Sequence, residues 1–274
     1  MAKYNYNNKR LNVADFQHPA DKKSVDAVLA VPGLDKVLEF ISKNSLERVY
    51  AFINNSSKMK ITPKMSPKIA EMLEEAVEMY GEHYIPEVYL ERNYAFFINL
   101  DGMTKPHLTL PSAWLENVDD KMLWAVLSSE IAAIQAKHGT IEFIENVVNF
   151  TKGLLPFGVD AALEIAINDW KRNRIYTVDR AILLGSEDFG IAAKHILFGD
   201  APESVIDSID LTKPGNAYYQ QATEFLKRTG VAGGIQKFET FLSGSQWMAS
   251  RYIELYNWYF SGEYHEVLER SVQE

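Results

Sequence analysis

The sequence contains no cysteine among its 274 residues, which excludes a disulfide framework and a thiolate metal site. It also lacks any run of about 20 uncharged apolar residues, the length that a membrane-spanning helix needs. The most apolar region, residues 140–169, is interrupted by charged side chains at Glu142, Glu145, Lys152, Asp160 and Glu164. A net charge of −9 argues against non-specific binding to nucleic acid or to anionic membranes.

The composition is otherwise ordinary for a globular protein, with 47% hydrophobic and 24% charged residues. The polar, Asn-rich start of the chain has no apolar run of the kind that a signal peptide contains. We therefore expect a soluble, cytoplasmic protein. Residues 1–15 are predicted to form a flexible segment, and residues 16–268 a single domain with a helix and sheet part at 16–110 and a helical part at 111–268.

Periodicity and breaker residues divide the chain into elements. Amphipathic helices are predicted over 20–31 and 34–43, on either side of Pro32-Gly33, and over 66–80. Apolar and aromatic runs predict strands at 46–54, 58–61, 87–91, 95–100 and 107–110. Beyond residue 139, helices are expected near 141–151, 158–184, 187–198, 215–228, 231–242 and 246–260. The predicted fold class is α+β, mostly α, with a small antiparallel sheet.

Segment 119–139 is predicted to be one long helix. Asp119 suits its N-cap, and apolar residues follow at helical spacing, namely Leu123, Val126, Leu127, Ile131 and Ile134. His138 suits the last turn, where positive charge meets the negative end of the helix dipole, and Gly139 suits the helix end. Glu130 is exceptional because it is an acid inside this apolar helix.

Several segments resemble, in order and spacing, the HtpX-like (family-48) zinc metallopeptidases. They are His18-Pro-Ala-Asp, Ala30-Val-Pro-Gly-Leu, Asn93-Tyr-Ala-Phe, segment 119–139, the stretch from Trp170 to Ala181, and Ser261-Gly-Glu-Tyr. The resemblance covers about residues 15–268 and implies a zincin-like metallopeptidase fold with a long active-site helix. In that family the helix carries His-Glu-x-x-His, in which two histidines four residues apart bind zinc and the glutamate acts as base.

This sequence departs from the family at the positions that bind the metal. Carried over position by position, the two histidines become Ser129 and Ala133, the third ligand becomes Ile175, and only the catalytic glutamate persists, as Glu130. A catalytic zinc needs about three protein ligands and an open position for water. Alanine and isoleucine offer no donor atom, and a serine hydroxyl is a poor ligand. We therefore predict no zinc, no other cofactor and no peptidase activity.

Other residues that the family places around the metal persist here as His138, Asp179 and Arg180. Since no metal ligand remains for Asp179 to orient, we expect it to form an ion pair or a helix-to-helix hydrogen bond. The candidate partners are Arg172, Arg180 and Arg251.

Two further hypotheses concern the former cleft. Ile175 is predicted to fill the space vacated by the metal and its imidazoles, because a carboxylate left there without its cation would be costly. Segment 92–99, with Asn93, Ala95 and Phe96, is either an edge strand that binds an extended peptide by strand addition or an ordinary edge strand guarded by polar residues.

The preferred interpretation is a catalytically inactive relative of a zinc metallopeptidase that binds a polypeptide or peptide in the former active-site cleft, as a binding or regulatory module. Neither nucleic acid nor an integral membrane span is expected. Two alternatives remain open. One is a hydrolase of another kind that uses Glu130 as acid or base, and the other is an active zinc metalloendopeptidase with an atypical metal site.

Overall fold

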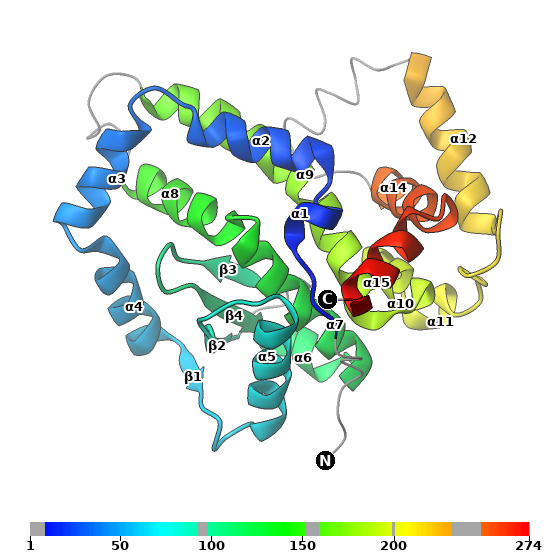
Figure 1. Cartoon of the computed structure of the whole chain (residues 1–274), viewed down its shortest axis with the longest axis horizontal. Helices are drawn as coiled ribbons and strands as arrows, with labels where there is room; N and C mark the ends of the chain where they lie inside the picture. Colours follow the sequence, from blue (N-terminus) through cyan, green and yellow to red (C-terminus); the bar gives the residue numbers. More distant parts are fainter. Residues whose placement is uncertain (1–8, 93–97, 152–158, 199–200, 232–247, 274) are drawn as a thin grey trace.

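The computed structural model describes residues 9–92, 98–151, 159–198, 201–231 and 248–273. This part of the chain is mostly helical and contains one four-stranded sheet (Figure 1). The predicted α+β, mostly helical class is therefore confirmed. None of the described helices is long and apolar enough to cross a membrane.

The sheet consists of β1 (Met59–Ile61), β2 (Glu87–Glu91), β3 (Asn99–Asp101) and β4 (His107–Pro111), in the order β1-β2-β4-β3. The outer pairs β1–β2 and β3–β4 are antiparallel, but the central pair β2–β4 is parallel, so the predicted antiparallel sheet is wrong. The reason is the position of β3, which lies beyond β4 at the sheet edge instead of between the strands that flank it in sequence.

The first helices are α1 (Val13–Phe16), α2 (Pro19–Leu29), α3 (Leu34–Lys43), α4 (Leu46–Ser57) and α5 (Pro67–Met79). Helices α2, α3 and α5 were predicted, but the strand expected over 46–54 is helix α4. Its apolar residues Leu46, Val49, Tyr50 and Ile53 follow helical spacing, which overrides the β preference of valine, tyrosine and isoleucine.

The chain ahead of residue 16 is part of the fold from Lys9 onward. Leu11 and Val13 are buried in the main core, and the buried Lys9 ammonium donates to the Leu184 carbonyl at 3.1 Å. The backbone N–H of Arg10 donates to the carbonyl of Ser271 at 2.8 Å, which ties the start of the described chain to its last helix. Residues 9–15 therefore differ from the flexible segment expected over 1–15.

Three helices follow the sheet, α6 (Ser112–Glu116), α7 (Asp120–Gln135) and α8 (His138–Phe150). As predicted, Asp119 caps α7, its side chain accepting from the N–H of Met122 at 2.7 Å. The expected single helix to residue 138 is wrong, because Lys137 adopts a left-handed conformation with φ of 63° and the chain turns into α8.

Gly139 lies in the first turn of α8 and does not end a helix. An added Cβ there would come within 3.1 Å of the Gly102 carbonyl oxygen and of the Leu100 side chain. The absent side chain thus lets α8 lie directly on the β3–β4 hairpin.

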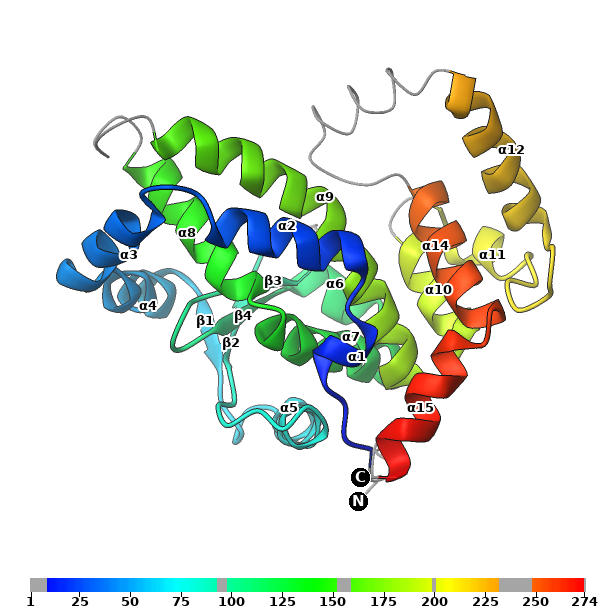
Figure 2. The ribbon, with the colours of Figure 1, turned by 45° about the horizontal axis from the view of Figure 1, so that its top comes forward.

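The remaining helices are α9 (Val159–Ser186), α10 (Phe189–Leu197), α11 (Glu203–Ile206), α12 (Ala217–Val231), α14 (Met248–Phe260) and α15 (Glu263–Gln273). Helix α9 packs on α2 and α7, and also on α10 and α14. In Figures 1 and 2 the sheet with α3, α4, α5 and α8 lies on one side of α9, and α10, α11, α12, α14 and α15 lie on the other. Most of the helix expected near 231–242 lies outside the described residues.

The contact of α7 with α9 is unusually close at Gly185. The indole Nε1 of Trp124 donates to the Gly185 carbonyl at 2.9 Å. A Cβ on Gly185 would collide with the Ser128 hydroxyl and come within 3.4 Å of the Ala125 Cα atom. A glycine at this position therefore sets the spacing of the helices that carry Ser129, Ala133 and Ile175.

Candidate functional site

Glu130 lies in the middle of α7, with Ser129 next to it and Ala133 one turn away, and all three side chains are buried. The Ser129 hydroxyl donates to the Val126 carbonyl at 2.8 Å within the same helix. Ser129 is thus engaged with its own backbone, while Ala133 has no polar atom.

Burial raises the pKa of Glu130 to about 8; the positive charge of Arg174 partly offsets this effect, and the negative charge of Glu142 adds to it. No residue in the described ranges forms a hydrogen bond with the Glu130 carboxyl group. The side chain is therefore largely protonated at pH 7. A protonated carboxyl group can donate a proton but cannot act as a general base.

The charges around Glu130 are held between α8 and α9. Arg174 pairs with Glu142 at 2.7 Å, and Lys171 pairs with Glu145 at 2.6 Å, all four side chains being partly buried. The Arg174 guanidinium also lies over the Trp170 ring, 4.8 Å from its centroid. These contacts fix a cation near the buried carboxyl group of α7.

Asp101, at the end of β3, is a second buried acid in electrostatic contact with Glu142. Burial, with Glu142 adding to it, raises the pKa of Asp101 to about 7, while a hydrogen bond from the Asn146 amide at 3.0 Å acts in the opposite direction. Glu142 thus faces two carboxyl groups with raised pKa values, Glu130 and Asp101. Sequence reasoning missed this cluster, although Glu142 and Glu145 stood out as charges within an apolar region.

The residues at the three positions that the resemblance aligns with zinc ligands do not fit a zinc ion. Ile175, on α9 beside Arg174, is half-buried and has no donor atom, nor has Ala133. Among the described residues, no group of three or more histidine, aspartate or glutamate side chains is arranged to hold a metal ion. A fixed guanidinium near Glu130 would also repel a divalent cation.

His138 does not end a helix as predicted; it begins α8 and forms a buried ion pair with Asp21 of α2. Its Nε2 lies 3.1 and 3.0 Å from the two carboxylate oxygens of Asp21. The Thr177 hydroxyl of α9 donates to the same carboxylate at 2.6 Å, and the Gln17 amide does so at 3.1 Å. Burial disfavours the charge on Asp21, but His138 and these hydrogen bonds outweigh it and lower the pKa of Asp21. Three helices are thereby joined.

Asp179 pairs with Arg251 of α14, one of the three partners that the sequence suggested. The Arg251 Nε and Nη2 atoms donate to the two carboxylate oxygens at 2.9 and 2.7 Å. Arg172 instead pairs with Asp169 at 2.9 Å. Arg180 donates to the Phe16 carbonyl at 3.0 Å and lies over the Trp258 ring.

The polar residues around Glu130 differ in their contacts. Asp21, His138, Asp179 and Arg251 hold helices together, whereas Glu130 has no ion pair with a described residue. Asn93, Ala95 and Phe96, the candidate peptide-binding residues, lie outside the described residues.

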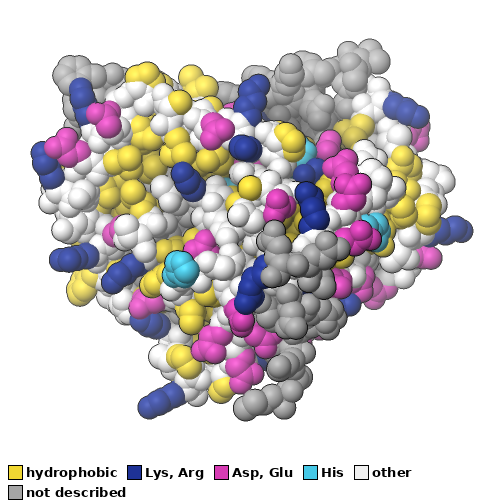
Figure 3. Space-filling view, viewed as in Figure 1, with side chains coloured by type: hydrophobic (Ala, Val, Ile, Leu, Met, Phe, Trp, Pro, Cys, Tyr) yellow, Lys and Arg dark blue, Asp and Glu magenta, His cyan; other side chains and the backbone are white. Residues whose placement is uncertain are grey.

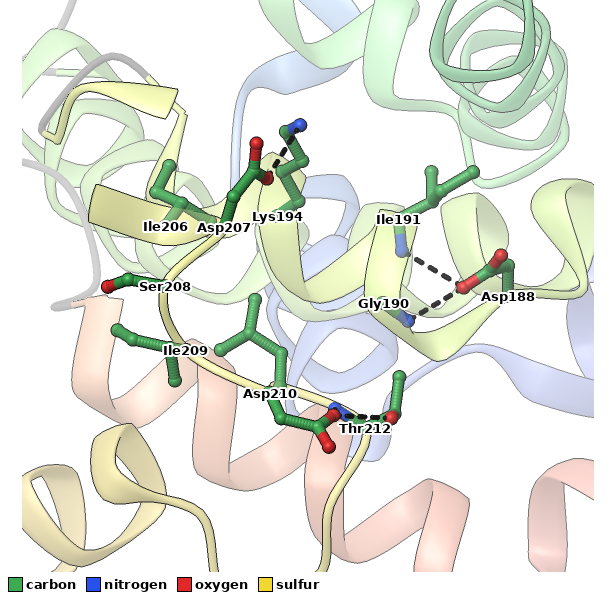
Figure 4. Close-up of a pocket in the computed structure, with 11 residues that line it drawn as sticks. Asp188, Gly190, Ile191, Lys194, Ile206, Asp207, Ser208, Ile209, Asp210 and Thr212 are labelled. Atoms are coloured by element: carbon green, nitrogen blue, oxygen red, sulfur yellow. Dashed lines mark hydrogen bonds and ion pairs between the residues drawn. The ribbon is translucent and has the colours of Figure 1, made fainter. Parts of the chain in front are cut away.

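A hollow of about 620 Å³ lies between α10 and residues 206–212 (Figure 4). Its charged groups are occupied, because Asp188 accepts from the N–H groups of Gly190 and Ile191 and Lys194 pairs with Asp207 at 3.2 Å. This arrangement caps α10 and fastens the segment after α11, and it offers a ligand no unpaired charge from these three side chains.

The described fold and site define a mostly helical α+β protein with a buried glutamate, Glu130, on helix α7. No model of a known protein family matches the chain, and no solved structure matches it. The sequence is similar to the plastoglobule-localized metallopeptidase 48, chloroplastic, of Arabidopsis thaliana, with 24% identity over 273 residues, 96% of this chain and 77% of that protein. This similarity supports a relationship to a metallopeptidase family.

Proposed function

We propose that this protein has a zincin-like fold, has lost zinc chemistry, and binds a polypeptide beside Glu130 as a binding or regulatory module. The observation that supports the loss of zinc chemistry is the lack of metal-binding atoms at positions 129, 133 and 175. The Ser129 hydroxyl donates a hydrogen bond to the Val126 carbonyl of its own helix, and the side chains of Ala133 and Ile175 have no metal-binding atom. Of the His-Glu-x-x-His motif only the glutamate remains, as Glu130, and burial raises its pKa to about 8, so that it does not serve as a base at pH 7.

The partner class follows from charge and from the relative. On the face in Figure 3, Lys and Arg side chains are interspersed with Asp and Glu and form no continuous basic surface, which does not favour nucleic acid. A metallopeptidase-like protein inherits a cleft suited to polypeptides, so a polypeptide is the partner that we infer. We also propose a cytoplasmic location, which cell fractionation with antibody detection tests directly.

Metal analysis and a cleavage assay test the loss of zinc chemistry. Protein purified without a chelator is expected to contain zinc well below one ion per chain and to leave fluorescein-labelled casein uncleaved. Glu130→Gln, which keeps the shape of the side chain, serves as the matched variant. Stoichiometric zinc, or cleavage that disappears in Glu130→Gln, would contradict the proposal.

Polypeptide binding is tested separately by fluorescence anisotropy with labelled casein. We expect saturable binding that Glu130→Gln retains, because Glu130 is already largely uncharged at pH 7. Hydrogen exchange should then show protection in α7 and α9. Absence of saturable binding, or protection confined to α12 and α15, would refute a polypeptide site beside Glu130.

The raised pKa of Glu130 favours one alternative function, a hydrolase of another kind in which Glu130 acts as general acid. Such an enzyme would lose activity as the pH rises through about 8, the pKa of Glu130. Screening the wild type and Glu130→Gln against ester, amide and glycoside substrates distinguishes this function, since only the wild type would act.

A further inference from the structure

A cavity of about 720 Å³ lies between α3, α4, the starts of β2 and β4, and the loop at residues 102–105. Its volume falls in the range of about 300–1,000 Å³ that small-molecule sites occupy. None of its lining residues comes from α7 or α9, so the cavity is separate from the Glu130 site.

The walls of this cavity are mainly apolar and aromatic. They include Leu38, Ile41, Leu46, Tyr50, Tyr84, Tyr89, Met103 and Phe143. The Tyr50 and Phe143 rings meet edge to face, with centroids 5.1 Å apart. The Tyr89 ring meets the buried His107 in the same way at 5.8 Å. Side chains held by such contacts present a preformed surface to a flat apolar body.

The two carboxylates of the lining are occupied by partners within the protein. Glu47 accepts from the backbone N–H groups of Met103 and Thr104 at 2.6 and 2.7 Å. Glu87 accepts from the Tyr89 hydroxyl at 2.6 Å and pairs with Lys60 at 2.5 Å. Because both carboxylates already have partners, they are poorly suited to bind a cationic ligand.

His107 contributes an uncharged polar group to the same lining. Asn54 donates to its Nε2 at 2.6 Å, and burial, reinforced by the positive charge of Lys58, lowers the pKa of His107 to about 4. The imidazole is therefore neutral at physiological pH, and it places no charge against an apolar ligand.

The two cationic side chains of the lining, in contrast, can bind an anionic ligand. Arg48 and Lys105 are both exposed, and neither side chain forms an ion pair or hydrogen bond with a residue in the described part of the chain. Arg48 and Lys105 equal Glu47 and Glu87 in number, but the two carboxylates already have partners within the protein.

We propose that this cavity binds a small amphipathic organic anion, with a flat aromatic body among the tyrosines and a carboxylate or sulfonate held by Arg48 and Lys105. The apolar walls would contact the aromatic part of the ligand, and Arg48 and Lys105 would bind its carboxylate or sulfonate. A neutral molecule of the same shape should bind more weakly, and salt should weaken the binding of the anion alone.

Two fluorescent probes of nearly the same shape test this proposal. 8-Anilinonaphthalene-1-sulfonate carries the anionic group, and N-phenyl-1-naphthylamine lacks it. The double variant Arg48→Gln, Lys105→Gln should weaken binding of the sulfonate about tenfold, or about 1.4 kcal/mol, and change that of the neutral probe less than about twofold. Ala51→Trp, which fills the cavity from α4, should abolish the binding of both probes.

Two control variants test whether the probe binds in this cavity and not elsewhere on the surface. Lys23→Gln removes an exposed cation of α2 outside the cavity, and Phe52→Ser removes a side chain that is 73% exposed on the outer face of α4. Neither should change the affinity for the sulfonate. Unchanged sulfonate binding in the double variant, loss of binding in Phe52→Ser, or absence of saturable binding to the wild type would each overturn the proposal. Circular dichroism of every variant establishes that it is folded.

Discussion

Arg251 on α14 binds both carboxylate oxygens of Asp179 on α9, with Nε to Oδ2 at 2.9 Å and Nη2 to Oδ1 at 2.7 Å. Asp179 is almost fully buried, and Arg251 is mostly buried. This pair fastens the C-terminal helices to the long helix that also carries Ile175. A residue that surrounds the metal in the resembling family thus serves here to connect helices.

Removing one partner of this pair should be costly. Arg251→Met leaves the buried Asp179 charge uncompensated, and we expect a loss of about 3–5 kcal/mol in the free energy of unfolding by urea. Arg228→Met, which breaks the exposed pair with Glu224, should cost less than about 1 kcal/mol. The double variant Asp179→Leu, Arg251→Met should lose less than Arg251→Met. Equal stability of Arg251→Met and wild type would show that the pair is dispensable.

The pair of Asp21 with His138 predicts that the stability of the protein falls at acidic pH. Because the folded protein lowers the pKa of Asp21 below its ordinary value of 3.8, the resulting stabilisation is present above that value and is lost as the pH falls through the folded value. Asp21→Asn should cost about 3 kcal/mol at pH 7 and less at pH 3. Asp15→Asn, at an exposed position of α1, should stay within about 0.5 kcal/mol of the wild type. A pH-independent cost of Asp21→Asn would contradict this account.

Glu130 predicts the opposite effect of pH on stability, a loss as the pH rises. The unfolded chain loses this proton near the ordinary pKa of 4.5, whereas the folded protein keeps it up to a pKa of about 8. Between these values the folded state binds more protons, so Glu130 destabilises the protein increasingly as the pH rises. The stability of Glu130→Gln relative to the wild type should increase by up to about 3 kcal/mol between pH 4.5 and 7. Parallel unfolding curves at pH 5 and 7.5 would exclude a raised pKa.

The alignment of Ser129, Ala133 and Ile175 with the zinc ligands of the family can be tested by introducing those ligands. Ser129→His, Ala133→His and Ile175→Glu, combined in one chain, should produce on the order of one bound zinc ion per chain by metal analysis. Adding Arg174→Gln should tighten zinc binding, because it removes a fixed positive charge near the site. A folded triple variant that binds no zinc would show that the three positions do not converge.

Close packing of α7 and α9 gives a further prediction. Gly185→Ala should cost about 1–3 kcal/mol, because its methyl group would overlap the Ser128 hydroxyl. Adding Ser128→Ala should recover part of the loss, since the nearest overlapping atom is the hydroxyl oxygen. Thermal unfolding of both variants measures the difference, and a fully stable Gly185→Ala would mean that the helices can separate without penalty.

Elements with both an amphipathic period and a cap were predictable from the sequence. Helix α5 lies within the predicted range 66–80, with Ser66 as its N-cap and Pro67 as its first residue, and α7 begins at the cap that Asp119 suggested. Helix α4 was predicted as a strand because its β-branched and aromatic residues were given more weight than their spacing. The parallel pairing of β2 with β4 could not be read from local sequence, since it depends on where β3 joins the sheet.

The site was predictable only in part. Sequence comparison placed Ser129, Glu130 and Ala133 on one helix, but the influence of Arg174 and Glu142 on Glu130 depends on how α8 and α9 pack. The role expected for His138 was wrong because nothing in the sequence marks Lys137, a residue that rarely adopts a left-handed conformation, as the corner.

The left-handed conformation of Lys137 also separates two helices that contact different parts of the molecule. Because α7 ends at Gln135, positions 129 and 133 lie on a different helix from His138 and Gly139. His138 and Gly139 belong to the next rigid unit, which is fastened to α2 and to the β3–β4 hairpin. Substitutions at positions 129 and 133 therefore do not remove any of the side chains that fasten α8 to α2 and to the hairpin.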